Sequence, residues 1–268
     1  MLQLLGALSF FVKFFVYTRI FVVFKSFPVL NRLMLLELVM DSFKYTLINY
    51  GIKLKEYTDG LLFGTDALLL SEFANGSGLP SNSRRIGLDL GTGSGVIPLL
   101  MLASGGAKQI TGLELQERYA SLAKENSEAN GFSERFSSIC GDIRNVRNDS
   151  RIESESFDFV TSNPPYLKSE GCGKMNISES KRIARHEDSC NADELCAAAA
   201  YALKYGGLFY VVYRPERLCV ILAALANHRL EPKRMVFAGT NPEKPSLVLI
   251  EAKKGGSEGL KVSFEKIV

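Results

Sequence analysis

From residue 85 onward, hydrophobic and polar positions along the chain follow two alternating periods. Short apolar runs predict buried strands at 86–90, 109–114, 136–140, 157–162 and 208–213. Apolar residues at helical spacing predict intervening helices over 96–104, 115–130 (Leu115, Tyr119, Leu122 and Ala123), 192–203 and 218–226. Two final strands, 234–238 and 247–251, are joined by a loop short enough for an antiparallel pair. This alternation predicts an α/β fold, a parallel sheet with helices on both faces.

The pattern before residue 85 is different and predicts a small N-terminal lobe. Residues 43–57 are expected to form two short strands around Asn49-Tyr50-Gly51, because Asn and Gly tolerate the backbone of a tight turn. A leucine-rich helix follows, with Thr65 or Asp66 as its cap. Composition shifts then divide the chain into an apolar N-terminal extension (1–40), the lobe (41–83), the α/β domain (84–254) and a C-terminal tail (255–268).

The extension at 1–40 is apolar, but basic residues interrupt it at short intervals. No uncharged stretch reaches the roughly 18–20 residues that a membrane-spanning helix needs. A signal peptide fits poorly, because no charge precedes the first apolar run. An interfacial helix is one alternative. Our preferred hypothesis is a translation start set too far upstream, with the working protein beginning near Met34 or Met40; membrane contact is expected only if the extension is real.

Charge and cysteine content narrow the function classes. The formal net charge is +3, and the four basic residues and one acidic residue of 1–40 account for all of it. A nucleic-acid surface would therefore have to be a local patch. The chain has two histidines and an odd number of cysteines without a C-x-x-C pair, so no metal site is expected. Free thiols point to the reducing cytoplasm.

The tetrapeptide Asn163-Pro164-Pro165-Tyr166 follows the strand predicted at 157–162. Each proline fixes φ and removes an N–H, so the segment is a stiff loop at a strand end. Open α/β sheets bind ligands at the carboxyl ends of their strands. Two acceptors in this loop can hold a planar amino group whose ring stacks on Tyr166. The alternative is an ordinary loop with two prolines.

A glycine-rich turn and three acidic residues supply a second candidate site. Gly91, Gly93 and Gly95 follow the strand at 86–90, and glycine lets the backbone approach a ligand. The turn lacks the G-x-G-x-x-G spacing of dinucleotide-binding folds, because Val96 replaces the third glycine. Asp89 precedes the turn, Glu114 ends the next strand and Asp142 follows the third. A carboxylate at the position of Glu114 can accept both hydroxyls of a ribose, and one at Asp142 an adenine amino group.

Together these residues resemble the Rossmann-like S-adenosylmethionine-dependent methyltransferases. Leu88 to Gly95 is similar to their first motif, and Asn163-Pro164-Pro165-Tyr166 to the motif that holds a target amino group. The resemblance implies a seven-stranded sheet, mostly parallel with an antiparallel C-terminal strand, preceded by a small N-terminal lobe. It implies S-adenosylmethionine as cofactor. The residues expected to bind it are Thr65, Asp66, Asp89, Gly91, Gly93, Gly95, Glu114, Asp142 and Asn163.

Within this class, Gly64 to Leu70 and Arg185-His186-Glu187 resemble the bacterial tRNA adenine N6-methyltransferases, which modify adenine 37 of a valine tRNA. Asn163, Pro164, Pro165 and Tyr166 would then be the catalytic residues, acting on an anticodon-loop adenine. Alternatives are a glutamine methyltransferase acting on release factors, which normally has a helical N-terminal domain, a ribosomal RNA methyltransferase, and a non-catalytic RNA-binding scaffold. Two basic groups are candidates for RNA contact: Lys168, Lys174, Lys181, Arg182 and Arg185; and Lys253, Lys254 and Lys261.

Overall fold

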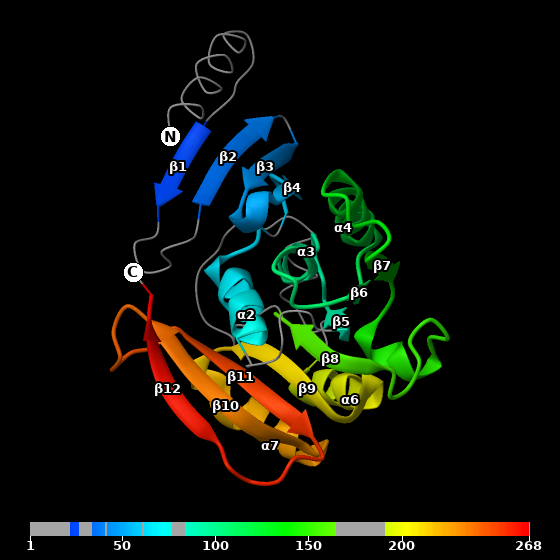
Figure 1. Ribbon diagram of the computed structural model, residues 1–268. Helices are drawn as coiled ribbons and strands as arrows, with labels where there is room; N and C mark the ends of the chain where they lie inside the picture. Colours follow the sequence, from blue (N-terminus) through cyan, green and yellow to red (C-terminus); the bar gives the residue numbers. More distant parts are fainter. Residues whose placement is uncertain are drawn as a thin grey trace.

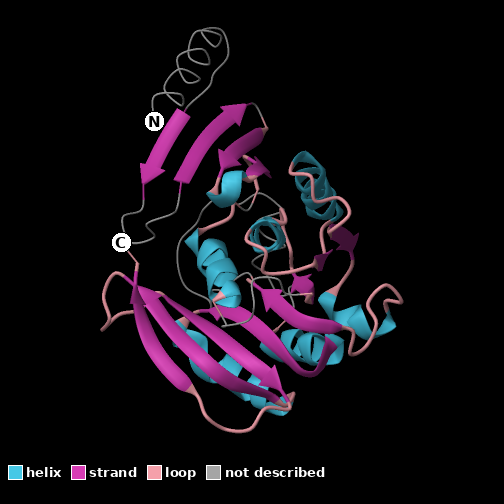
Figure 2. Cartoon of the chain, in the orientation of Figure 1, coloured by secondary structure: helices cyan, strands magenta, loops and turns pink. Residues whose placement is uncertain are grey.

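The computed structural model describes residues 22–26, 34–40, 42–60, 62–76, 84–164 and 191–267. They form two sheets with helices packed around the larger one (Figures 1 and 2). The small sheet has the order β1-β2-β3-β4, all antiparallel, and the large sheet has the order β12-β10-β11-β9-β8-β5-β6-β7. The large sheet is parallel apart from β11, which runs antiparallel to β9 and β10.

The small sheet comprises β1 (Val22–Ser26), β2 (Met34–Met40), β3 (Phe43–Leu47) and β4 (Lys53–Tyr57). The predicted hairpin around Asn49-Tyr50-Gly51 is confirmed, and Tyr50 and Gly51 both have the positive φ that it requires (61° and 75°). The sheet also takes two strands from the part of the chain assigned to the extension.

Helix α2 (Thr65–Asn75) connects the two sheets, and its cap differs from the prediction. The N-cap is Gly64, without a side-chain hydrogen bond, while Thr65 and Asp66 already belong to the helix. The Oδ1 atom of Asp66 accepts a hydrogen bond from the amide of Ala67 instead.

The large sheet begins with β5 (Ile86–Leu90), α3 (Val96–Ala103), β6 (Gln109–Glu114), α4 (Glu117–Ala129) and β7 (Phe136–Cys140). It continues with β8 (Phe157–Ser162), α6 (Ala192–Ala202), β9 (Leu203–Tyr213), α7 (Leu218–Asn227), β10 (Leu230–Gly239) and β11 (Leu247–Lys254). Helices α2, α3 and α4 cover one face of the sheet, and α6 and α7 cover the other (Figure 1). The predicted α/β architecture is confirmed.

Two strands of the large sheet and one position before helix α4 differ from expectation. The sheet gains an eighth strand, β12 (Lys261–Lys266), which pairs parallel to β10 and comes from the predicted tail. Strand β9 begins at Leu203 rather than 208. Its pairing with β8 shifts register between Phe157 and Phe159. Leu115 lies before α4 and is 41% exposed, so it does not belong to the buried face of that helix.

Candidate functional site

The predicted site residues emerge side by side at the carboxyl edge of the large sheet. Leu90 of β5 is the register partner of Ser162 on one side and of Leu113 on the other. The residues that follow these three partners are Gly91, Asn163 and Glu114. Because neighbouring strands lie about 4.8 Å apart, the glycine turn stands between the carboxylate of Glu114 and the proline loop. Asp142 follows β7, one strand beyond Glu114.

Backbone hydrogen bonds tie the glycine turn to β6. The amides of Gly91 and Thr92 both donate to the carbonyl of Leu113, at 2.8 and 3.1 Å. Thr92 fits there because Gly112 lies beneath it: a Cβ on Gly112 would stand 2.7 Å from the Thr92 side chain. The turn is therefore held in a fixed position above the strand that carries Glu114.

The three glycines of the turn have positive φ but different surroundings. No described atom lies within 4 Å of where a Cβ would stand on Gly91 or Gly93, so their backbone is open for close approach by a ligand. A Cβ on Gly95 would lie 2.7 Å from the ring of Phe136 and 3.3 Å from Ala123. Gly95 thus serves packing, whereas Gly91 and Gly93 form an open cradle that fits an adenosine-type cofactor.

Glu114 is 8% exposed, and its carboxylate organises the turn. One oxygen accepts the amide of Gly93 at 2.9 Å, and the other accepts the amide of Gln116 at 3.0 Å. Burial raises the pKa of Glu114, while the backbone hydrogen bonds oppose that shift. Each carboxylate oxygen keeps a second lone pair, so Glu114 can still accept the two hydroxyls of a ribose.

Asp89 is 1% exposed beneath the turn. Its Oδ1 accepts a hydrogen bond from the hydroxyl of Thr161 at 2.6 Å, which ties β5 to β8 below Asn163. Burial raises the pKa of Asp89 to about 6, and the nearby charge of Glu114 adds to the shift; the hydrogen bond from Thr161 opposes it. Asp89 supports the turn from below.

Asp142 is engaged by Arg144, a contact that the sequence pattern did not reveal. The Asp142 carboxylate caps the turn at Ile143–Asn148 by accepting the Arg144 amide, and it also accepts the guanidinium at 2.7–3.1 Å. The hydrogen bonds from Arg144 lower the pKa of Asp142. An adenine amino group would share this carboxylate with Arg144.

Asn163 and Pro164 are half-buried at the end of β8, whose last residue Ser162 donates its hydroxyl to the Leu90 carbonyl at 2.7 Å. Thr161 and Ser162 are polar residues at the end of β8, and these polar positions are the signal from which the two cross-strand bonds could have been predicted. Pro165, Tyr166 and the basic residues of 168–185 lie outside the described residues. Thr65 and Asp66 begin α2, which packs against α3 next to the turn.

The second basic group does not lie at this edge. Lys253 and Lys254 end the antiparallel β11, and Lys261 begins β12 opposite Arg234, so all three lie toward the amino ends of the parallel strands. Because β8 is about 17 Å long, roughly that distance separates the amino edge of the sheet, where these lysines lie, from Asn163. The Nζ of Lys254 is also bound to Glu155 and to the Leu203 carbonyl.

Comparisons with known proteins identify the family of the chain. The family model described as "Methyltransferase small domain" matches residues 63–224. A tRNA1(Val) (adenine(37)-N6)-methyltransferase of Porphyromonas gingivalis is 32% identical over 213 residues, covering 78% of the chain and 79% of the relative. A relative of the same name from Shewanella halifaxensis is 31% identical and covers 73% of the chain and 78% of its own length.

The chain belongs to this methyltransferase family. Its members use S-adenosylmethionine, so the chain is an S-adenosylmethionine-dependent methyltransferase, as the sequence predicted. Among solved structures, a "predicted O-methyltransferase" of Agrobacterium tumefaciens has a TM-score of 0.56 at 20% identity, covering 76% of this chain and 86% of that one. That likeness confirms the fold.

The described residues also bear on other classes of site. No described helix has the length and apolar character to cross a membrane. Within the described ranges, no three His, Cys, Asp or Glu side chains are grouped so that they would bind a metal ion. Cys140 and Cys219 carry free thiols.

Proposed function

We propose that this methyltransferase transfers the methyl group of S-adenosylmethionine to N6 of an adenine in tRNA, and that the target is adenine 37 in the anticodon loop of a valine tRNA. The proposal rests on one observation: the glycine turn and Asn163 follow paired residues, Leu90 and Ser162, on adjacent strands. A methyl donor cradled by the turn would therefore lie next to an amino group held at Asn163. The names of the relatives supply the tRNA and the adenine.

The roles of the chain's own residues follow from their chemistry. The open backbone of Gly91 and Gly93 would accommodate the cofactor, and Glu114 would accept its ribose hydroxyls. The side-chain oxygen of Asn163 and the carbonyl of Pro164 would accept the two N–H bonds of the adenine amino group. Both acceptors favour a pyramidal nitrogen, whose lone pair is otherwise delocalised into the ring. Tyr166 would stack on the base, which is worth roughly 1–3 kcal/mol.

The cofactor supplies a methyl group that is already activated on a sulfonium sulfur. Asn163 and the Pro164 carbonyl would hold N6 in line with this methyl group, and N6 would release a proton to water after accepting it. No strong general base is needed, so positioning of the amino group provides most of the rate. Extruding the base from its stack costs a few kcal/mol.

The strand character of the small sheet favours this substrate over a release factor. The glutamine methyltransferases normally carry a helical N-terminal domain, whereas β3 and β4 of this chain form a hairpin. Labelled cofactor offered with separate pools of tRNA, ribosomal RNA and release factor tests the choice directly. Label in the tRNA pool that disappears when adenine 37 is replaced by guanine supports the proposal; label in another pool overturns it.

Asn163→Ala tests the residue roles. The variant is expected to lose methyl transfer and to keep its affinity for S-adenosylmethionine within about twofold, measured by calorimetry, since only the amino-group acceptor is removed. Asn163→Asp retains an acceptor and is expected to keep part of the activity. Asn191→Ala, at the N-cap of α6, is the matched control for an asparagine away from the site. Near-normal turnover by Asn163→Ala would refute the assignment.

A further inference from the structure

Asn126 of α4 and Asn130, the C-cap of the same helix, occupy the open edge of the small sheet. Strand β4 is the last strand in that sheet's order, so among the described residues no strand neighbours its outward backbone groups. Asn126 accepts the Lys55 amide at 2.8 Å and donates to the Lys55 carbonyl at 2.9 Å. Asn130 makes the same pair of bonds to Lys53, at 2.8 and 2.7 Å. The asparagines thus replace a fifth strand.

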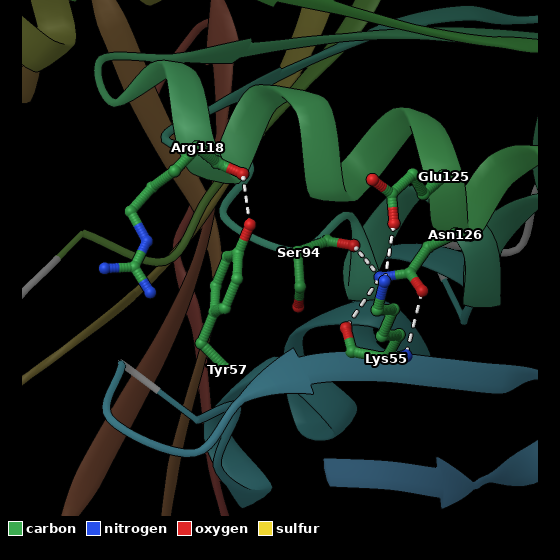
Figure 3. Close-up of polar contacts among 6 residues, drawn as sticks. All are labelled: Lys55, Tyr57, Ser94, Arg118, Glu125 and Asn126. Atoms are coloured by element: carbon green, nitrogen blue, oxygen red, sulfur yellow. Dashed lines mark hydrogen bonds and ion pairs between the residues drawn. The ribbon is translucent and has the colours of Figure 1, made fainter. Parts of the chain in front are cut away.

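The spacing of these residues explains the fit. Residues four apart on a helix rise about 6 Å, and residues two apart on a strand span about 6.7 Å. Each side-chain amide can therefore meet one outward-facing peptide of the strand. An ion pair between Lys55 Nζ and Glu125, at 2.8 Å, holds the same strand against the helix (Figure 3).

Asn126 differs from Asn130 in one contact. Its Nδ2 also donates to the carbonyl of Ser94 at 2.9 Å, within the glycine turn (Figure 3). The second donor bond of Asn130 goes to the Asn126 carbonyl of its own helix, at 2.7 Å. Asn126 is 1% exposed, so the bond to the turn forms away from water, where a lost partner is expensive.

The hydrogen bond from Asn126 to the Ser94 carbonyl is linked to the carboxylate of Glu114 through the neighbouring residue of the turn. Ser94 is preceded by Gly93, whose amide donates to Glu114 at 2.9 Å. A continuous series of hydrogen bonds therefore connects β4, Asn126, the glycine turn and Glu114. Both ends of the turn are already fixed, by Leu113 at Gly91 and by close packing at Gly95. Asn126 fixes the middle, between the two.

We infer that Asn126 is a positioning residue for S-adenosylmethionine: it anchors the glycine turn to the edge of the small sheet and so makes cofactor affinity depend on that sheet. The inference rests on the proposed assignment of the turn and Glu114 to the cofactor. Asn126 itself need not touch the cofactor, because it acts through the Ser94 carbonyl.

Three variants separate this role from simple stabilisation. Asn126→Ala removes the bonds to both the strand and the turn, whereas Asn130→Ala removes only the equivalent bonds to the strand. Calorimetry with S-adenosylmethionine, at a temperature where every variant is folded, is expected to show about tenfold weaker binding for Asn126→Ala, as loss of one buried hydrogen bond would give. Asn130→Ala is expected to bind within about twofold of the parent, although both variants lose stability.

Glu114→Gln distinguishes failure of this inference from failure of the underlying site. Weakened binding in Glu114→Gln with unchanged binding in Asn126→Ala overturns the inference and leaves the proposed site standing. Unchanged binding in Glu114→Gln overturns both. Equal losses in Asn126→Ala and Asn130→Ala also overturn the inference, because they would show a general effect of detaching β4.

Hydrogen exchange provides a readout that needs no activity. In cofactor-free Asn126→Ala, the peptide spanning residues 91–96 is expected to exchange faster, while in Asn130→Ala only the peptide containing β4 does so. If Asn126→Ala does not fold, Asn126→Ser keeps a hydroxyl that can hold one partner and permits the same comparison. Protection of residues 91–96 that is unchanged in the variant at 126 would overturn the inference.

Discussion

Asp89→Asn is expected to stabilise the protein at neutral pH. The folded chain holds the pKa of Asp89 at about 6, mainly through burial, against an ordinary value of 3.8 for an aspartate. Between these two pH values the folded state binds more protons than the unfolded state, so the contribution of Asp89 to stability falls as pH rises. A shift of about 2 units corresponds to roughly 3 kcal/mol, most of which is lost between pH 4 and pH 7. Asparagine keeps an oxygen for the Thr161 hydroxyl and carries no charge.

Urea unfolding of the parent and of Asp89→Asn, without cofactor, measures this effect at several pH values from 4 to 7.5. The stability of the variant relative to the parent is expected to increase by about 2–3 kcal/mol across that range. Thr161→Val provides the opposite perturbation, because removing its hydroxyl raises the pKa of Asp89 further and steepens the loss of stability. A difference between Asp89→Asn and the parent that stays constant from pH 4 to pH 7 would contradict the argument.

Two further pairs of variants test packing, one pair at the glycine turn and the other away from the site. Gly95→Ala is expected to destabilise by roughly 2–4 kcal/mol in urea unfolding, because its Cβ would meet Phe136 at a positive φ; Gly91→Ala adds no described clash and is expected to lose cofactor affinity more than stability. Arg234→Ala is expected to cost roughly 2–4 kcal/mol, because its guanidinium is bound to Glu251 and to the Phe73 carbonyl and stacks on the Phe73 ring. Lys204→Ala, which breaks an exposed ion pair with Asp158, is expected to cost under about 1 kcal/mol. Equal losses of stability in Arg234→Ala and Lys204→Ala would contradict the greater weight given to the contacts of Arg234.

The sequence predicted the strands and turns that form the carboxyl edge of the sheet. Strands β5, β6, β7 and β8 have the predicted bounds, because each is a short apolar run that ends at a glycine or a polar residue. Periodicity also located Tyr119, Leu122 and Ala123 on the buried face of α4. These features depend on local pattern, which a sequence displays directly.

The features that pattern did not reveal arise from tertiary contacts. Val262 and Phe264 alternate with polar residues in β12, but all six residues are exposed, so no buried face marks the strand and it exists through its pairing with β10. The start of β9 contains Gly206 and Gly207, a pair typical of a turn, yet Leu203 before them pairs with β8 and Leu208 after them pairs with both β8 and β11. Asn126 and Asn130 have helical spacing on a buried face, but which backbone they meet depends on where β4 lies.

Strand β12 also bears on self-association of the protein. It ends the order of the large sheet, with Val262 58% exposed and Phe264 36% exposed. An accessible edge with apolar side chains is a template on which another chain can add a strand, the first step of aggregation. Lys261, Glu265 and Lys266 surround these residues, and charges on an edge strand oppose such pairing. The charged residues of β12 therefore protect concentrated protein from self-association.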